Sequence, residues 1–243
     1  MKDLNDKVVV ITGATKGLGA ALSRGFAHTG AKVAICARGS EELKQIEKEI
    51  ISSGGEVFSL PVDVKDPEQV QRFVSGTLNK FGKVDALINN ASILGKRVPV
   101  SDYDYETWCD VIDVNVTGIF LMTKAFLPSM MKQRSGSVVN LSSGVGNKGK
   151  PNWGAYSVSK FGVEGFSYML AEELREYSVR VNIVNPGGLA TDMRRAAYPE
   201  EDQSTLKKPE DILPVFLYLV SDTSKNMTGS RINAQEFDVP AGL

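Results

Sequence analysis

Short apolar runs alternate along this chain with longer stretches in which apolar residues recur at helical spacing. In the stretch 41–53, for example, Leu43, Ile46 and Ile50 fall on one helical face. The short runs are rich in Val and Ile and are typical of strands. The predicted strands are 8–12, 33–37, 56–61, 84–89, 137–142, 179–185 and 230–235. The predicted helices are 18–28, 41–53, 67–81, 105–131, 154–177 and 209–221.

Near-continuous apolar strands separated by helices are typical of a parallel sheet that is covered on both faces. The pattern therefore predicts an α/β fold, a Rossmann-like, doubly wound parallel sheet of seven strands with helices on both faces. We find no linker, repeat or low-complexity segment, so we expect residues 1–243 to form one domain. Ligands of such sheets bind outside the carboxyl ends of the strands.

The composition limits the partners that this chain can have. Hydrophobic residues make up 42% of the chain and charged residues 23%, which is ordinary for a globular protein. The formal net charge of -1 does not favour nucleic acid or an anionic membrane, so we expect neither. The two cysteines fit a reducing compartment, and residues 1–7 lack a targeting pattern. Since no apolar run approaches ~18 residues, we expect a cytoplasmic protein without a membrane span.

The chain has a single histidine, His28, which lies in a predicted helix. One histidine makes a Ser-His-Asp hydrolase or a histidine-ligated zinc site hard to build. Cys36 and Cys109 form no metal-type cluster with their neighbours in sequence. We therefore expect no metal, and a structural role for His28.

A glycine-rich segment follows the first predicted strand and leads directly into a helix. It reads Thr12-Gly13-Ala14-Thr15-Lys16-Gly17-Leu18-Gly19. Glycines let the backbone turn sharply and approach a pyrophosphate, and a helix N-terminus supplies free N–H groups and positive potential. The spacing departs from the usual Gly-x-Gly-x-x-Gly, so a tight turn with packing glycines is the alternative. The strand–loop–helix setting favours a dinucleotide site.

The end of the second strand bears on which dinucleotide is bound. An acidic residue there would bind a ribose 2′-hydroxyl and repel a 2′-phosphate. The strand ends instead in Ala37-Arg38, and Lys16 of the glycine-rich segment adds a second cation. These cations favour NADP(H) over NAD(H); the alternative is that Arg38 only caps a surface turn.

Candidate catalytic chemistry lies in the run Tyr156-Ser157-Val158-Ser159-Lys160, with Ser143 upstream. Residues four apart on a helix project from one face, so the phenol and the ammonium can share a hydroxyl of substrate or cofactor. A cation beside a phenol favours the phenolate, and lowering its pKa by ~3 units takes ~4 kcal/mol. Ser143 can donate to the same reacting oxygen. With seven tyrosines in the chain a Tyr-x-x-x-Lys pair can arise by chance, and the alternative is a solvated helix pair.

Together these motifs resemble the short-chain dehydrogenase/reductase family, in its compact single-domain branch. The resemblance covers nearly the whole chain and includes the Ser143–Tyr156 separation. It rests on the segment from Thr12 to Gly19, Asp63-Val64, Asn89-Asn90-Ala91, Asn115-Val116-Thr117-Gly118, Ser142-Ser143, Tyr156-x-x-x-Lys160, Asn185-Pro186-Gly187 with Thr191, and Pro209-Glu210-Asp211-Ile212.

The resemblance implies a role for each of four catalytic residues. Tyr156 is implied to be the proton donor in reduction and the base in oxidation. Lys160 is implied to hold the nicotinamide ribose hydroxyls and to lower the tyrosine pKa. Ser143 is implied to polarise the substrate carbonyl, and Asn115 to position a water that links Lys160 to solvent.

The resemblance also implies cofactor contacts. Asp63 and Val64 are implied to flank the adenine, Asn90 the adenosine ribose, and the segment from Pro186 to Thr191 the nicotinamide, with the Leu189 backbone on its carboxamide. The expected cofactor-binding set is Gly13, Thr15, Lys16, Gly17, Leu18, Gly19, Arg38, Asp63, Val64, Asn90, Tyr156, Lys160, Pro186, Gly187, Leu189 and Thr191.

The chain departs from the family pattern in two places. After the last strand it reads Asn233-Ala234-Gln235 where relatives often have Asp-Gly-Gly, so its tail need not pack as theirs does. The stretch 191–209, the implied substrate lid, is short, which favours an open pocket and leaves an acyl-carrier substrate in question. Arg194 and Arg195 in this lid can meet an anionic substrate, or simply form a solvated loop face.

The leading hypothesis is an NADP(H)-dependent carbonyl reductase or alcohol dehydrogenase that acts on a small or medium organic substrate by hydride transfer. A 3-oxoacyl reductase is one form of it. The alternatives are a catalytically silent NADP(H)-binding sensor or scaffold, and a nucleotide-sugar epimerase or dehydratase, which needs a longer substrate domain. The resemblance also implies a homotetramer or homodimer joined through the helices at 105–131 and 154–177.

Overall fold

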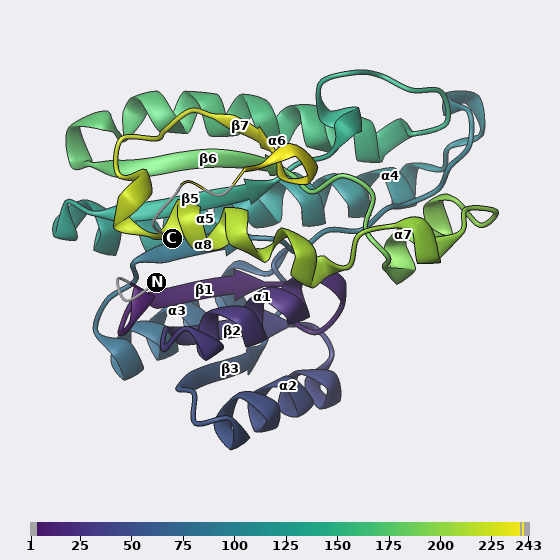
Figure 1. Ribbon diagram of the computed structural model, residues 1–243. Coiled ribbons are helices and arrows are strands. Elements are labelled where there is room, and N and C mark those ends of the chain that lie inside the picture. The colour runs from purple at the N-terminus through teal and green to yellow at the C-terminus, as the bar shows by residue number, and fades with distance from the viewer. Residues whose placement is uncertain (1–3, 239, 241–243) are drawn as a thin grey trace.

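The computed structural model describes residues 4–238 and residue 240. In this part of the chain seven parallel strands form one sheet in the order β3-β2-β1-β4-β5-β6-β7 (Figure 1). The strands are β1 (Val8–Thr12), β2 (Lys32–Ala37), β3 (Val57–Pro61), β4 (Ala86–Asn89), β5 (Gly136–Leu141), β6 (Val179–Asn185) and β7 (Arg231–Asn233). The direction of winding reverses between β1 and β4, which opens a crevice at their carboxyl ends. The predicted doubly wound parallel sheet is confirmed.

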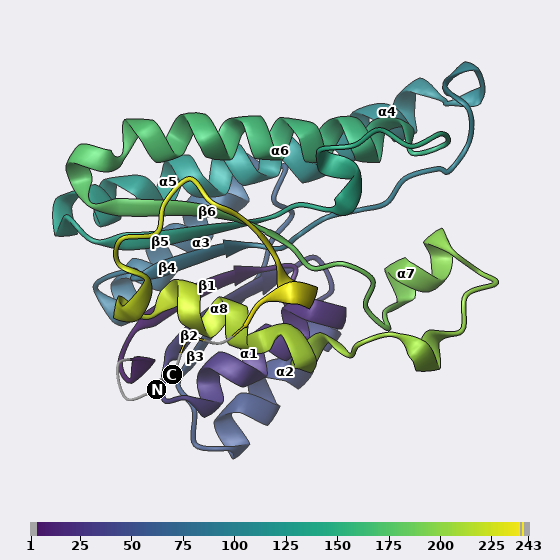
Figure 2. The same cartoon turned by 45° about the horizontal axis from the view of Figure 1, so that its top comes forward.

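Helices cover both faces of this sheet, in two layers that Figures 1 and 2 show from different sides. One layer contains α1, α2 and α8, and the other contains α3, α5 and α6. The helices are α1 (Gly17–His28), α2 (Ser40–Ser52), α3 (Pro67–Phe81), α4 (Tyr105–Ile112), α5 (Gly118–Gln133), α6 (Gly154–Glu173), α7 (Asp192–Ala197) and α8 (Leu213–Val220).

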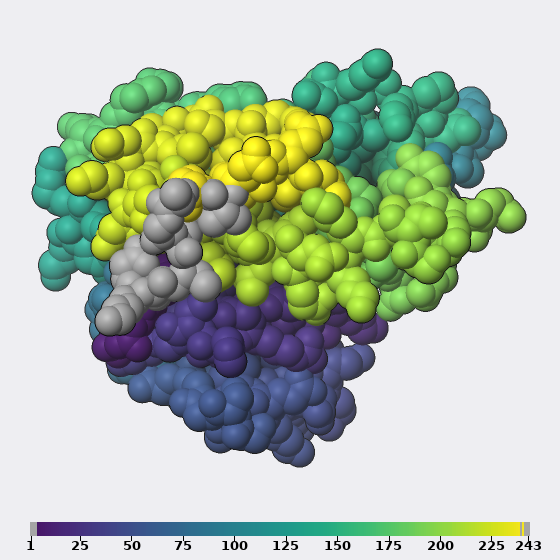
Figure 3. All heavy atoms as spheres, viewed as in Figure 1, coloured from purple at the N-terminus to yellow at the C-terminus, as the bar shows by residue number. Residues whose placement is uncertain are grey.

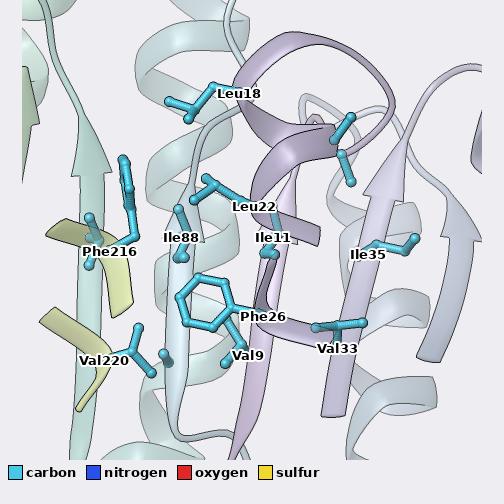
Figure 4. Packing of buried hydrophobic residues seen from close by; sticks show 14 of the residues in the cluster. Val9, Ile11, Leu18, Leu22, Phe26, Val33, Ile35, Ile88, Phe216 and Val220 are labelled. Carbon is cyan, nitrogen blue, oxygen red and sulfur yellow. The ribbon is translucent and has the colours of Figure 1, made fainter. Parts of the chain in front are cut away.

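Alternate residues of each strand enter different cores, because successive side chains of a strand point to opposite faces. Val9 and Ile11 of β1 lie in the core beneath α1, where Phe26 fills the space between helix and sheet (Figure 4). Val10 lies in the opposite core together with Phe126 of α5. Because helices bury both faces of the sheet, the central strands are apolar at nearly every position. This continuous apolar pattern made the strands recognisable in the sequence.

The bounds predicted for β1, β6 and α3 agree with the structure. Helix α3 shows why, since both of its ends carry specific caps. The Asp66 carboxylate accepts hydrogen bonds from the main-chain N–H groups of Glu68 and Gln69, at 2.9 and 3.1 Å. Gly82 ends the helix with a φ of 74°, in the left-handed region that glycine adopts without strain.

Several predicted elements are divided or shorter. The helix predicted at 154–177 ends as α6 at Glu173 and is followed by a 3-10 turn at Arg175–Tyr177. The helix predicted at 105–131 consists of α4, a π-helical turn at Asp113–Thr117, and α5. The one predicted at 209–221 begins with a 3-10 turn at Pro209–Ile212 and becomes α8 only at Leu213. Strand β7 is shorter than predicted because Ala234–Glu236 forms a 3-10 turn. Apolar periodicity does not distinguish π, α and 3-10 turns, so the pattern could not predict these changes.

One helical run has a property that the search for apolar runs missed. The run Tyr105–Gln133 has a mean hydropathy of 1.3 and is long and apolar enough to cross a membrane. Among the described residues it is the only helical run that meets this criterion. In the structure it packs on the sheet through Met122, Phe126 and Met130. Within the apolar window of this run, 44% is buried inside the protein.

Candidate active site

Two connected hollows lie at the carboxyl ends of the strands. The larger has a volume of about 360 Å³ and lies where β1, β4, β5 and β6 end. The second, of about 320 Å³, lies at the ends of β1, β2 and β3. Four residues line both: Gly13, Lys16, Ala91 and Ser92. The two hollows therefore form one elongated cleft across the reversal point of the sheet, as expected for a dinucleotide site.

The glycine-rich loop after β1 forms the middle of the cleft. Gly13 has a φ of +65°, and a Cβ on Gly19 would lie 2.1 Å from the Gly13 carbonyl oxygen, so the two glycines let the backbone close up. Helix α1 starts after Lys16 without a side-chain cap, which leaves its first N–H groups facing the loop. The loop can thus hold a pyrophosphate against a helix N-terminus. Gly17 and Leu18 line the larger hollow beside it, and Thr15 the smaller.

Asn90 braces this loop from the neighbouring strand. Its side-chain nitrogen donates to the carbonyl oxygens of Thr12, at 2.9 Å, and Gly13, at 3.1 Å. The Thr12 hydroxyl in turn accepts from the main-chain N–H groups of Asn90 and Ala91. The predicted cofactor residue Asn90 therefore lies in the cleft and also ties the ends of β1 and β4 together.

The smaller hollow contains the residues expected around an adenosine. Arg38 follows β2 and is exposed, while Asp63 and Val64 follow β3 and line the same hollow. The sequence argument missed Glu42, which also lines it and lies 3.9 Å from the Lys16 ammonium. Only the folded chain reveals this, because Glu42 belongs to the first turn of α2 and no motif includes it.

Ser143, Tyr156 and Lys160 meet in the larger hollow. Ser143 follows β5, and the first two turns of α6 carry the tyrosine and the lysine. The Lys160 side chain is 2% exposed, and its Nζ donates to the Leu141 carbonyl oxygen at 2.8 Å. The same Nζ lies 5.4 Å from the centre of the Tyr156 ring. The Ser143 hydroxyl lies close enough to the tyrosine hydroxyl to lower its pKa, so these two groups can share one reacting oxygen.

The expected effect of Lys160 on the Tyr156 pKa is wrong for the protein without cofactor. Burial raises the pKa of Tyr156 to about 12, and the hydrogen bond with Ser143 only partly opposes this rise. Burial likewise lowers the pKa of Lys160 to about 8. Desolvation disfavours the charged form of both groups and outweighs their attraction, because the ammonium faces the ring rather than the hydroxyl. Tyr156 therefore remains a proton donor at neutral pH.

Ser92 is a third hydroxyl beside this tyrosine, and the motif search passed over it. It directly follows the Asn-Asn-Ala motif, lines both hollows, and also lowers the pKa of Tyr156. Its oxygen is buried and makes no well-formed hydrogen bond within the described residues. Its place at the end of a strand next to a motif was the only available signal.

Asn115 lies in the π-helical turn, where its side chain is fully buried. The side-chain oxygen accepts from the Ile93 N–H at 2.8 Å, and the nitrogen donates to the Ile93 carbonyl and the Ser159 hydroxyl, each at 3.0 Å. The amide thus joins the segment after β4 to the residue preceding Lys160. A link between Asn115 and the ammonium has to use its main chain, since these contacts occupy the side chain.

The segment after β6 forms the remaining wall. Pro186, Gly187, Leu189 and Thr191 all line the larger hollow, as expected for residues beside a nicotinamide. Gly187 has a φ of +72°, and a Cβ there would lie 2.4 Å from the Gln235 side chain. Glycine is required at this position for two reasons: its φ lies in the left-handed region, and Gln235 leaves no space for a side chain.

Arg97 stacks between two aromatic rings, those of Trp153 and Tyr198, and so holds the lid, 191–209, against the rest of the protein. The sequence did not predict this contact. The Arg97 guanidinium carbon lies 4.6 Å from the Trp153 ring and 4.8 Å from the Tyr198 ring, and Arg97 donates to the Ala197 carbonyl. Trp153 also packs against Tyr156, with 5.6 Å between ring centres. These contacts connect the lid to Tyr156.

The lid arginines are already paired with acids. Arg194 forms two hydrogen bonds of 2.5 Å with the Glu201 carboxylate, and its guanidinium carbon lies 3.9 Å from the Tyr198 ring. Arg195 pairs with Asp192 at 3.0 Å. Their charges are balanced within the lid, so the idea that they meet an anionic substrate gains no support. Within residues 4–238 and 240, no three His, Cys, Asp or Glu side chains gather as metal ligands.

Comparisons with known proteins agree with this geometry. Residues 7–202 match the family model described as short chain dehydrogenase. An oxidoreductase of Escherichia coli strain K12, YciK, is 38% identical over 235 residues, which cover 96% of this chain and 93% of the relative. The 3-oxoacyl-[acyl-carrier-protein] reductase FabG of Thermotoga maritima is 38% identical over 238 residues, which cover 94% and 96% of the two chains.

A solved structure extends this comparison to the fold. A short chain dehydrogenase from Shigella flexneri, crystallised in complex with NADP, superposes with a TM-score of 0.93 at 37% identity. The match covers 97% of this chain and 100% of that one.

Replacing Lys160 with Met should stabilise the ligand-free protein by about 1–2 kcal/mol at pH 7, since the gain from removing a buried ammonium exceeds the loss of one hydrogen bond. Burial lowers the pKa of Lys160 from 10.5 to about 8, so the folded state binds this proton less tightly than the unfolded state. The penalty is complete below pH 8 and disappears as the pH rises to 10.5, so the stability advantage of the variant should shrink over this range.

Thermal unfolding at pH 7 and at pH 10 measures this difference. The exposed Lys148→Met exchange serves as the control and should leave the melting temperature unchanged. A Lys160→Met protein that melts below wild type at pH 7 would contradict the prediction.

Proposed function

The chain belongs to the short-chain dehydrogenase family, and from that premise we propose that it is an NADP(H)-dependent oxidoreductase interconverting a carbonyl and an alcohol. The observation that carries the proposal is that Ser143, Tyr156 and the buried Lys160 line one hollow at the end of a dinucleotide-shaped cleft. One domain, residues 1–243, supplies all of these groups.

The proposed mechanism assigns the proton chemistry to Tyr156. The nicotinamide, when bound, supplies or accepts the hydride. Ser143 and Tyr156 both donate hydrogen bonds to the substrate oxygen, which gains negative charge during reduction. Tyr156 then gives up its proton, and its raised pKa keeps that proton in place at neutral pH until the oxygen requires it. Oxidation needs the reverse, a tyrosinate, so the ligand-free site suits reduction better.

Lys160 holds the ribose side of the site in this proposal. Its ammonium uses one hydrogen for the Leu141 carbonyl and can direct the others at ribose hydroxyls. Asn115 positions the relay to solvent through the π-helical turn that precedes α5. Both residues act on the reacting tyrosine without touching the substrate.

NADP(H) is the proposed cofactor because two cations face the adenosine end of the cleft. Arg38 and Lys16 both line the smaller hollow, and no acid ends β2. The Shigella flexneri relative holds NADP, which supports the same preference here. Glu42 beside Lys16 weakens the positive field, so Arg38 is the principal reader of the 2′-phosphate.

The proposed substrate is a small or medium ketone with an apolar body. Leu94, Trp153, Met193 and Ala197 line the larger hollow near Tyr156, and the lid arginines are paired. A 3-oxoacyl group fits these walls, and the Thermotoga maritima relative is named for that reaction. The alternative proposal, a sensor or scaffold that binds NADP(H) without catalysis, is distinguished by following NADPH oxidation with a panel of ketones that includes 3-oxoacyl thioesters. Binding without oxidation favours the sensor.

We also propose a homodimer or homotetramer in the cytoplasm. Apolar side chains of α5 and α6 form an exposed stripe: Phe120 is 43% exposed, Phe161 46% and Met169 44%. On α6 these residues recur at helical spacing together with Val158 and Tyr168. Such a continuous apolar face is typical of an interface between copies.

Tyr156→Phe should lower kcat by at least ~100-fold while leaving NADPH affinity nearly unchanged, because it removes the donated proton and keeps the ring. Steady-state NADPH consumption and a separate titration of NADPH binding measure the two effects. Tyr168→Phe, on the exposed side of the same helix, is the matched control. Retained turnover in the Tyr156→Phe protein would remove the catalytic assignment.

Arg38→Asp should reverse the cofactor preference, because the new carboxylate repels a 2′-phosphate and accepts from a ribose 2′-hydroxyl. The ratio of kcat/KM for NADPH to that for NADH is the quantity to compare. Arg72→Asp makes the same charge change on the exposed side of α3 and should leave the ratio as it is. An unaltered ratio in Arg38→Asp would mean that another group reads the phosphate.

Phe161→Glu should convert the assembly into smaller species, since it places a charge in the apolar stripe. Light scattering coupled to gel filtration gives the molar mass directly. Ile51→Glu, an exposed apolar position on α2, should not alter it. A wild-type protein that is already monomeric would contradict the proposed assembly.

A further inference from the structure

A buried ion pair lies directly behind the catalytic serine. The Arg231 Nε lies 2.9 Å from the Glu164 Oε1, and the two side chains are only 16% and 6% exposed. Glu164 lies on α6 one turn after Lys160, and Arg231 begins β7, far away in the sequence. A desolvated pair of this kind contributes little to stability by itself, because removing two charges from water offsets their attraction.

The ion pair is hydrogen-bonded to the catalytic segment. A second guanidinium nitrogen of Arg231 donates to the Ser143 carbonyl oxygen at 3.1 Å. The Ser142 hydroxyl donates to the Glu164 carboxylate at 2.5 Å. The pair therefore holds the Ser142 side chain and the Ser143 main-chain carbonyl, one on each side of the peptide bond that joins the two residues. This backbone sets where the Ser143 hydroxyl lies relative to Tyr156.

The same C-terminal segment also holds the wall after β6. Arg231 donates through its third nitrogen to the Asn233 side-chain oxygen at 3.0 Å, which also accepts from Asn185 at 3.0 Å. Two residues further on, the Gln235 amide donates to the carbonyl oxygens of Pro186, at 2.9 Å, and Gly188, at 3.1 Å. In the space-filling view, this C-terminal segment (yellow) packs over the segment leading into α8 (Figure 3).

We propose that the segment from Arg231 to Gln235, anchored by Glu164, is a positioning brace that sets the geometry of both Ser143 and the 186–188 wall. The inference rests on the proposed function for its catalytic part. It falls where the sequence departs from the family pattern, Asn233-Ala234-Gln235, so the departure has a structural role. None of these residues touches the substrate, and they act through the segments that they hold.

The first experiment separates positioning from folding with methionine substitutions of similar length. Arg231→Met, Glu164→Met and the double variant are compared by kcat, KM and melting temperature. Arg231→Met leaves the Glu164 charge without its partner and should lower both melting temperature and kcat. In the double variant the unpaired charge is gone, so the melting temperature should recover. Its kcat should stay at least ~10-fold low, because the Ser143 carbonyl still lacks its donor.

Arg180→Met is the matched control for this experiment. Arg180 is another partly buried arginine that donates to main-chain carbonyls, those of Leu219 and Ser221, away from the cleft. Its loss should lower the melting temperature and leave kcat unchanged. If kcat of the double variant instead recovers together with its melting temperature, the ion pair is only structural and the proposal is overturned.

The second experiment needs no turnover. Gln235→Met keeps the packing on Gly187 but removes both donated hydrogen bonds. It should weaken NADPH binding by at least ~5-fold, as expected for two lost bonds, and leave adenosine 2′,5′-bisphosphate binding unchanged within ~2-fold. Equal loss for both ligands, or no loss for either, overturns the proposal. If none of the ketones tested leads wild type to oxidise NADPH, the proposed function fails. The binding comparison still tests the positioning brace in that case.

Discussion

The candidate active site depends on the burial of one ammonium group at the carboxyl edge of the sheet. Lys160 is almost inaccessible, and among the described residues the Leu141 carbonyl alone accepts a hydrogen bond from it. An ammonium group has two further hydrogens, which Lys160 can donate to ligand atoms in the hollow that it lines. The same burial that lowers the pKa of Lys160 also raises that of Tyr156, so Tyr156 is protonated at neutral pH in the ligand-free protein. Burial of the Lys160 charge therefore lowers the stability of the folded protein at the place where the proposed chemistry needs this ammonium.

A second constraint is how closely backbone segments approach one another around the cleft. Gly19 lies so close to the Gly13 carbonyl oxygen that there is no room for a side chain on Gly19. The Asn90 side chain joins this loop to the end of β4. Gly187 is packed in the same way beneath Gln235. The walls of the dinucleotide cleft are therefore set by main-chain geometry, and the polar side chains around them hold that geometry in place. This explains why so many of the hydrogen bonds at the site join a side chain to the backbone.

The C-terminal segment has the same function from the other side. Arg231 and Gln235 reach the two segments that carry Ser143 and the nicotinamide wall, and Glu164 anchors them to the helix that carries the catalytic pair. The lid is attached separately, through Arg97 between Trp153 and Tyr198. Substrate access and catalytic alignment thus depend on different parts of the fold.

The sequence by itself determined the parallel sheet, the bounds of elements such as α3, the family, and many of the residues that line the cleft, although not Glu42 or Ser92. These features depend on local chemistry, since apolar runs, the Asp66 cap and glycines at strand ends act within a few residues. Only the tertiary structure decided the charge state of Tyr156 and Lys160, the π-helical turn at Asn115, the pairing of Arg194 with Glu201, and the partners of Arg231. Desolvation and ion pairing depend on atoms from distant segments, and a linear pattern contains no information on how closely those segments approach.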